Sequence, residues 1–135
     1  MSGDSAMTMM PTDHASAQRW ALNWIAAWNA RDIEAVLRLF ADDCRFRSPK
    51  AATITGHGTV RGKPALRAYW QAALATIPSL QFSFEAAHWD PDAGTLLIRY
   101  VASLGGQRLL AAEIFDFDDQ ACVACGTALY GAPVD

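Results

Sequence analysis

The chain has 135 residues, of which 52% are hydrophobic, 19% charged and 10% aromatic; this size and apolar content fit one folded domain with a core and exclude wholesale disorder. Eleven Lys and Arg residues against 14 Asp and Glu residues, a formal net charge of −3 at pH 7, argue against a nucleic-acid-binding domain. No apolar run approaches the ~20 residues of a membrane-spanning helix, so neither nucleic acid nor a membrane is an expected partner.

The N-terminal segment, residues 1–11, is expected to be a flexible arm that precedes a single domain over residues 12–135. The arm lacks the apolar run of a secretory signal peptide. The whole chain holds three cysteines, which are too few for a disulfide scaffold. We therefore expect a reducing, cytoplasmic location.

Two helices are predicted in the first third of the chain. The first begins near Thr12 or Asp13, either of which can cap a helix. Tryptophans recur along it every four residues and so share one face: Trp20, Trp24 and Trp28. Asp32 caps the second helix, whose apolar residues follow the spacing i, i+3, i+4 and i+7: Ile33, Val36, Leu37 and Phe40.

A short strand, a loop and a third helix are expected next. Alternation of side chains predicts the strand over residues 44–48. The loop spans residues 49–62 and includes a small extended piece at residues 59–61. Pro64 suits the first turn of the third helix, whose buried face would hold Leu66, Tyr69, Trp70, Ala73 and Leu74.

Four longer strands complete the predicted fold, over residues 81–89, 96–104, 107–118 and 122–130. Gly105 and Gly106 signal a tight hairpin, and consecutive hairpins imply an antiparallel meander. Helices followed by a run of strands predict an α+β fold, in which the helices cover one face of a curved sheet.

Glu113 is the main chemical candidate in the sequence. By strand alternation it lies in the middle of an apolar row: Leu109, Ala111, Phe115 and Phe117. Small residues line the same face of the last strand and would leave unfilled volume: Ala124, Gly126 and Ala128. An apolar cavity with one carboxyl group in its wall is expected, and burial would raise the pKa of that carboxyl. Alternatively, Glu113 is ionised and paired with an arginine, or lies at a dimer contact.

Three segments carry a family resemblance: WIAAWNARDIEAVLRLFADDCRFRSP, GKPALRAYW, and AAEIFDFDD with the later ALYG. They resemble the nuclear-transport-factor-2-like superfamily, and most closely its SnoaL-like polyketide-cyclase and ketosteroid-isomerase branch, over residues 18–131. The resemblance implies a cone-shaped α+β fold of three helices on a strongly curved, mixed but mostly antiparallel sheet that encloses a pocket. It also implies a homodimer formed through the outer face of the sheet.

Matched residue by residue, the chain resembles the isomerases in its acid but not in its base. Their proton-shuttling aspartate is matched by Ser48, whose hydroxyl has no proton affinity near pH 7 without an adjacent base. Their protonated aspartate is matched by Glu113. The chain thus argues against ketosteroid isomerisation. The other residues predicted to bind substrate are Trp24 and Trp70, in place of two family tyrosines, and Tyr100, Phe115 and Tyr130.

Two functions stay open. In the first, Glu113 is the acid/base of an isomerase-, cyclase- or hydratase-type enzyme that acts on a small apolar or polycyclic compound, by analogy with SnoaL-like cyclases that use a single pocket acid. In the second, the pocket binds an apolar ligand, or the chain is a dimeric interaction module, without catalysis. The sequence contains no phosphate-cradling glycine loop and no metal-ligand motif, so neither a cofactor nor a metal is expected.

Other candidate residues have a structural explanation. His57 is expected to lie on the surface, although its glycine-flanked loop could reach the pocket mouth. His88 shares strand parity with Phe82 and is expected near the core. Cys122 and Cys125 are spaced like metal ligands, but residues three apart on a strand face opposite sides. The predicted outer sheet face is apolar, which independently indicates a partner sheet: Leu97, Val101, Ala112, Ile114, Cys125 and Leu129.

Overall fold

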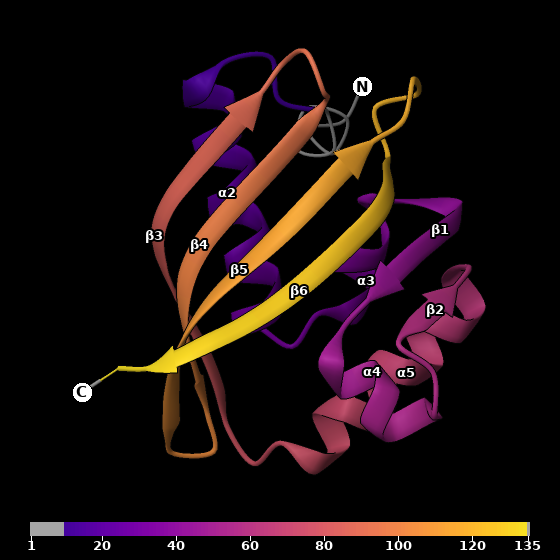
Figure 1. Ribbon diagram of the computed structural model, residues 1–135, viewed down its shortest axis with the longest axis vertical. Coiled ribbons are helices and arrows are strands. Elements are labelled where there is room, and N and C mark those ends of the chain that lie inside the picture. Colours follow the sequence, from indigo (N-terminus) through magenta and orange to yellow (C-terminus); the bar gives the residue numbers. More distant parts are fainter. Residues whose placement is uncertain (1–9, 135) are drawn as a thin grey trace.

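The computed structural model describes residues 10–134, which form four helices and one six-stranded sheet (Figure 1). Residues 1–9 of the predicted arm lie outside the described residues, and Pro11 is fully buried. The helices are α2 (His14–Asn29), α3 (Ile33–Leu37), α4 (Pro49–Thr55) and α5 (Lys63–Thr76). The strands are β1 (Phe40–Arg47), β2 (Thr59–Arg61), β3 (Leu80–Asp90), β4 (Thr95–Leu104), β5 (Gln107–Phe117) and β6 (Val123–Pro133).

Helices α2 and α3 begin at the predicted capping residues. The Asp13 carboxylate accepts a hydrogen bond from the Ser16 N–H at 2.8 Å, and the Ser16 hydroxyl oxygen accepts one from the Asp13 N–H at 3.0 Å. Asp32 caps α3 with its side chain. Because α3 ends at Leu37, the prediction that Phe40 belongs to this helix is wrong: Phe40 begins β1.

Helix α4 corrects the predicted loop over residues 49–62. The Ser48 hydroxyl oxygen accepts a hydrogen bond from the Lys50 N–H at 3.1 Å, and Pro49 occupies the first turn. Gly56 ends the helix with a φ of 83°, a backbone conformation that favours glycine. A cap, a proline and a glycine therefore delimit a seven-residue helix that has only one buried residue and so lacks a strong apolar pattern. The extended piece predicted at residues 59–61 is β2.

The strands follow the order β2-β1-β6-β5-β4-β3. Strands β1 and β6 run parallel, and every other neighbouring pair is antiparallel. This mixed, mostly antiparallel sheet confirms the predicted α+β class, and the sheet is not closed. In Figure 1, α2 covers one face of the four long strands, while α4 and α5 lie beside β1 and β2. Among the described helices, none combines the length and apolar character that a membrane crossing requires.

A bulge in β3 corrects the expected position of His88. The pairing register with β4 shifts between Phe84 and Ala86, and an extra residue in a strand reverses the alternation beyond it. His88 is therefore exposed on the outer face, where its Nε2 accepts a hydrogen bond from Arg99 Nε at 3.2 Å. Trp89 turns inward instead and packs against Phe117 with ring centroids 5.9 Å apart.

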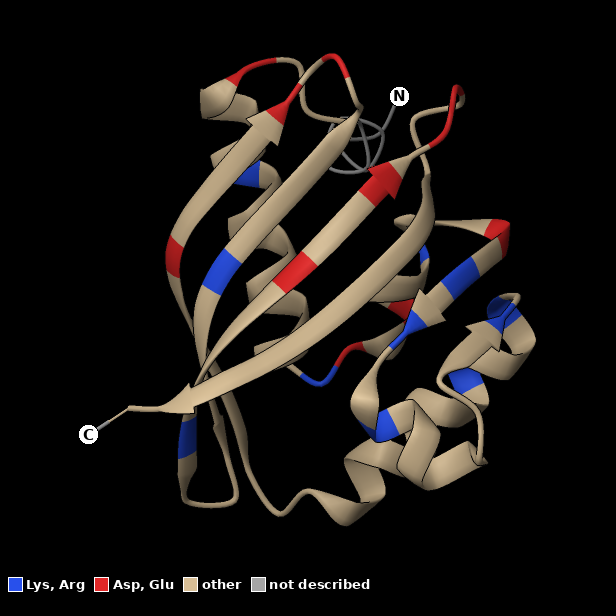
Figure 2. Cartoon of the chain, in the orientation of Figure 1, with Lys and Arg blue, Asp and Glu red and all other residues tan. Residues whose placement is uncertain are grey.

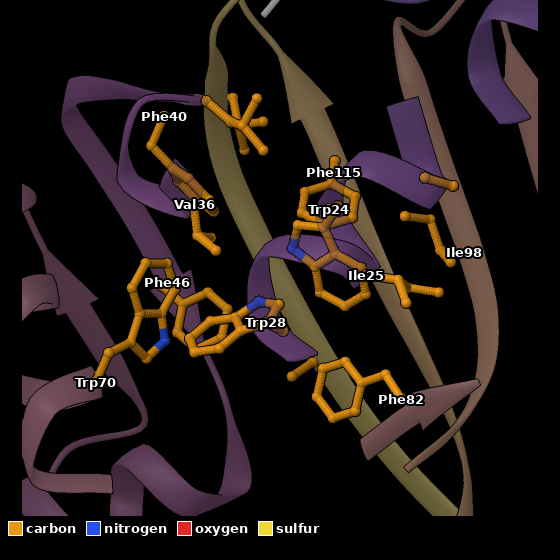
Figure 3. Packing of buried hydrophobic residues seen from close by; sticks show 14 of the residues in the cluster. Trp24, Ile25, Trp28, Val36, Phe40, Phe46, Trp70, Phe82, Ile98 and Phe115 are labelled. Atoms are coloured by element: carbon orange, nitrogen blue, oxygen red, sulfur yellow. The ribbon is translucent and has the colours of Figure 1, made fainter. Parts of the chain in front are cut away.

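The aromatic side chains of α2 pack against the inner face of the sheet. Figure 3 shows Trp24 and Trp28 gathered with Trp70 between the helices and the strands. Trp24 stacks on Phe82 with ring centroids 5.6 Å apart, and Trp28 meets the edge of Trp70 at 5.0 Å. The Asn29 amide fixes the end of α2 to β3, because it donates to the Phe82 carbonyl at 3.0 Å and accepts from the Phe82 N–H at 2.7 Å.

The outer face of the sheet is open in the single chain. Leu110 is 42% exposed and Leu129 is 48% exposed, and β6 carries no Lys, Arg, Asp or Glu (Figure 2). Such an apolar face favours coverage by a partner, and the predicted homodimer stays a prediction. Cys122 precedes β6, Cys125 is buried on it, and both are free thiols. Residues 10–134 hold no group of His, Cys, Asp and Glu side chains that could bind a metal ion.

Candidate functional site

An apolar cavity lies between α2, α5 and the inner face of the sheet. Its volume is about 50 Å³, which is room for roughly four waters or one small organic molecule. The wall is formed by Trp24, Trp28, Phe46, Ser48, Lys50, Tyr69, Trp70, Ala73, Leu74, Ile77, Leu80, Phe82, Tyr100, Leu104, Glu113 and Tyr130. These residues come from α2, β1, α4, α5 and all four long strands, so the site exists only in the assembled fold.

Glu113 lies in the cavity wall as an uncharged acid. It is 5% exposed, near the middle of β5, where it pairs with Ile98 of β4 and Ala128 of β6. Its Oε1 accepts a hydrogen bond from the Tyr100 hydroxyl at 3.4 Å, and none of the ion pairs among residues 10–134 involves it. Burial raises the pKa of Glu113 to about 8, because desolvation of the carboxylate outweighs the opposing effect of the Tyr100 hydrogen bond. Glu113 is therefore mostly protonated at pH 7.

Three tyrosines surround this acid. The pKa values of Tyr69, Tyr100 and Tyr130 are all raised, in each case chiefly by burial. The nearby Glu113 raises all three further, because a second negative charge beside a carboxylate is unfavourable. All three phenols therefore stay protonated near neutral pH and are hydrogen-bond donors.

The hydroxyl of Ser48 is already engaged in the structure. Ser48 is 7% exposed, and its Oγ accepts from the Lys50 N–H at 3.1 Å and from the Tyr69 hydroxyl at 3.4 Å. Neither neighbour is a base. Ser48 thus caps α4 and holds Tyr69 in the cavity wall, and it has no partner that would activate it as a nucleophile or a base.

Trp24 contributes its indole ring to the cavity wall. Its Nε1 is buried and has no hydrogen-bond partner among the described residues. The indole packs between Phe82, Tyr100 and Phe115, with ring centroids 5.3–5.6 Å away. A role of this N–H as a donor to substrate stays a prediction.

Most of the residues predicted to bind substrate meet in the cavity: Trp24, Ser48, Trp70, Tyr100 and Tyr130, together with Glu113. Phe115 does not line it, which corrects its assignment. Two residues further along β5 is a step of about 7 Å, and there Phe115 is fully buried against Trp20, at 4.8 Å between ring centroids. It belongs to the packed core.

The small residues of β6 do not create the cavity. A side chain added at Gly126 would lie 3.2 Å from ring atoms of both Phe40 and Phe46. These two phenylalanines come from β1, whose length exceeds the predicted strand, and they fill the space over Gly126. The expected void in this part of the sheet is therefore occupied, and the observed cavity lies beside Glu113 and Tyr130.

The sequence does not predict a site role for ten of the sixteen wall residues, and two of these ten, Lys50 and Tyr69, carry a polar group that could bind a ligand. Tyr69 was predicted on the buried face of its helix, and its position next to Trp70 was the signal that both could reach the pocket. Lys50 has no such signal, because the sequence predicts a loop where the short α4 presents this residue. Its Nζ lies 5.2 Å from the centre of the Tyr130 ring, a distance at which the cation is attracted to the ring face. His57 lies in a separate surface groove against α5, not in this cavity.

A family model described as SnoaL-like domain matches residues 21–124, so the chain belongs to the SnoaL-like family. A solved structure of a SnoaL-like protein of unknown function from Burkholderia thailandensis is 36% identical, with a TM-score of 0.79, over 90% of this chain and 99% of that chain. A putative ketosteroid isomerase from Kribbella flavida is 18% identical, with a TM-score of 0.68, over 92% and 84% of the two chains.

The fold is also similar to that of SalBIII, an epoxide hydrolase/cyclase-like enzyme in pyran ring formation of the polyether salinomycin. That structure is 13% identical, with a TM-score of 0.67, and the match covers 88% of this chain and 93% of that chain. Comparison with curated protein sequences gave no significant match. Identities of 18% and 13% to the isomerase and to SalBIII establish a shared fold. The chemistry of this protein therefore has to be argued from its own site.

Proposed function

We propose that this protein is a small acid–base enzyme in which neutral Glu113 donates a proton to an oxygen of a small apolar substrate. One observation carries the proposal: a buried carboxyl group without a cationic partner faces a cavity walled by aromatic side chains. Keeping such a group costs stability, because a buried polar residue replaces an apolar one. A pKa near neutrality is also the value at which a carboxyl group is most effective as a general acid.

The proposed cycle uses one carboxyl group twice. Glu113 gives its proton to a carbonyl or epoxide oxygen, and the resulting carboxylate is stabilised by the hydrogen bond from the Tyr100 hydroxyl. The carboxylate then removes a proton from a substrate carbon, or from a water or hydroxyl oxygen that adds to the activated substrate, and so returns to its neutral form. These alternatives correspond to isomerase-, hydratase- and cyclase-type reactions. SalBIII, described as epoxide hydrolase/cyclase-like, offers an analogy for the last.

The size of the cavity favours a small apolar substrate over a polycyclic compound. Its volume of about 50 Å³ is well below the roughly 300–1,000 Å³ of sites that hold drug-sized ligands. Trp24, Trp28 and Trp70 occupy much of the space between the helices and the sheet. We therefore propose a compact substrate of a few carbon atoms with one reacting oxygen.

Glu113→Gln tests the proposal, because glutamine keeps the shape of the neutral acid but cannot transfer its proton. Hydrogen–deuterium exchange at carbons next to the carbonyl of small ketones and aldehydes, together with hydration of small epoxides, can be followed by NMR. We expect Glu113→Gln to lower any such rate by about 10²–10⁴-fold. The matched control is Glu85→Gln on the exposed outer face, which should leave the rate unchanged. Equal rates in wild type and Glu113→Gln would refute the proposal.

A non-catalytic ligand-binding module is the second candidate. The engaged Ser48 hydroxyl supports it, and so does a cavity wall in which Glu113 is the one carboxyl group and no histidine is present. In this case, small apolar ligands would raise the melting temperature, and no turnover would be detected with any of them. Turnover that depends on Glu113 would exclude this candidate.

We propose a second copy of the chain as the partner of the outer sheet face, on the basis of the family resemblance and of the exposed Leu110 and Leu129. Leu129→Glu should convert the dimer to a monomer in sedimentation velocity runs, because a carboxylate would have to be buried in the interface. A monomeric wild type would contradict the homodimer. The cytoplasmic location rests on the sequence and stays a prediction.

A further inference from the structure

The cavity wall contains one fixed charge at neutral pH. Among the wall residues, Lys50 is the one lysine or arginine and Glu113 is the one carboxylic acid. Glu113 is neutral for the reason given above, whereas Lys50 makes none of the ion pairs found among residues 10–134. The chain's other lysine, Lys63, lies outside the cavity and pairs with Asp42 at 3.6 Å. The positive charge of Lys50 is therefore available to a ligand in the cavity.

Lys50 and Glu113 are both neighbours of Tyr130 in the cavity wall. The Lys50 ammonium group is over the ring of Tyr130, whereas Tyr130 is close enough to Glu113 for that carboxyl to raise its pKa. A ligand that lies along Tyr130 would thus come near both the cation and the proton donor. Lys50 is not among the groups that shift the pKa of Glu113.

The rest of the outer part of the cavity is apolar. Partly exposed leucine and isoleucine side chains come from the end of α5, the segment after it, β3 and β4: Leu74, Ile77, Leu80 and Leu104. Arg31 holds this region in place, because its guanidinium donates to the carbonyls of Leu74 at 3.4 Å and Ile77 at 3.1 Å. These side chains match the apolar body of a ligand, and Lys50 is the cationic side chain in the wall that can pair with an anionic group.

We infer that the cavity takes a compact apolar carboxylate, with the carboxylate at Lys50, the apolar body against the leucine side chains, and the reacting oxygen at Glu113. A single lysine suits a monovalent carboxylate, whereas a phosphate calls for several donors. A cationic ligand would be repelled by Lys50, even though the aromatic wall could otherwise attract it. The inference rests on the proposed function, because it names the substrate class of the same cavity.

Three compact probes that differ in charge test this assignment: pivalate, its neutral amide pivalamide, and trimethylammonium. Three of the five tryptophans line the cavity, so binding can be followed by tryptophan fluorescence at pH 7. We expect wild type to bind pivalate about tenfold more tightly than pivalamide, as for one partly buried charge-assisted hydrogen bond. Lys50→Met should remove this preference, and Lys50→Arg should keep it. The matched control, Lys63→Met, should bind like wild type.

Several results would overturn the inference: equal affinity of wild type for pivalate and pivalamide, a preference that survives in Lys50→Met, tighter binding of trimethylammonium than of pivalate, or no binding of any probe. Glu113→Gln separates this test from that of the proposed function. Pivalate should still bind to this variant, since glutamine mimics the neutral acid. If pivalate binds through Lys50 while the Glu113→Gln substitution leaves turnover unchanged, the ligand class stands and the acid–base mechanism fails.

Discussion

Two stretches of the same inner sheet face differ sharply. Around Phe115, aromatic side chains from α2, β1 and β5 close the space completely, with Trp20 and Trp24 in edge contact with its ring. Two residues earlier on β5, Glu113 faces a cavity of about 50 Å³. The candidate site therefore lies where the aromatic packing stops. Glu113 and Phe115 share one face and one extended conformation on β5, so the difference between a packed core and a chemical site comes from the residue type.

The largest expected effect is the pH dependence that Glu113 imposes on stability. Its pKa is about 8 in the folded chain and 4.5 in an exposed carboxyl group, so the folded state holds the proton more tightly. Stability from this group is complete below about pH 4.5 and is lost as the pH rises to about 8, a change on the order of 5 kcal/mol in the free energy of unfolding. Urea unfolding at pH 5 and pH 9 measures it. Glu113→Gln should remove this part of the pH dependence, and an unchanged slope would show that the acid is hydrated.

The next largest effect is the loss of stability expected when the aromatic packing around Phe115 is removed. Phe115→Ala should lower the free energy of unfolding by about 3–5 kcal/mol, because Phe115 is fully buried and its truncation leaves a cavity in the core. Leu129→Ala is the matched control, since this leucine is 48% exposed and the single chain should lose less than about 0.5 kcal/mol. Urea titrations of both variants, under conditions that give monomers, measure the difference. A loss below about 1 kcal/mol at Phe115 would mean that this stretch is as loosely packed as the cavity.

A smaller effect is expected where Phe40 and Phe46 fill the space over Gly126. Gly126→Ala places a methyl group 3.2 Å from both rings, and the buried rings cannot move away freely. We expect a loss of about 1–2 kcal/mol from overpacking, measured by thermal or urea unfolding. Gly58→Ala is the control, because a side chain there meets nothing within 4 Å. A stabilised Gly126→Ala variant would show that unfilled volume remains over β6.

The predicted and observed folds agree where short-range signals are strong. The caps at Asp13 and Asp32, the tryptophan spacing on α2 and the glycine hairpin between β4 and β5 all follow from interactions within a few residues. The inward direction of Glu113 follows from strand alternation alone. The family resemblance added the mixed sheet, which no local pattern in the sequence indicates.

The errors occur where distant segments decide the outcome. His88 faces outward because a bulge in β3 changes its register against β4, and a bulge has no reliable sequence signal. Phe115 lies outside the cavity because α2 covers it. Lys50 reaches the cavity because α4, stabilised by its cap and its packing on α5, presents it beside Tyr130.

The sequence by itself determined that an acid would be buried, since periodicity fixes which face of a strand each residue takes and hydrophobic neighbours show that the face is covered. Only the tertiary structure decided what that acid meets. The positions of Tyr69, Tyr100, Tyr130 and Lys50 around Glu113 depend on how α4 and α5 pack against the long strands, and this packing is set by contacts between residues far apart in the chain, which no local pattern encodes.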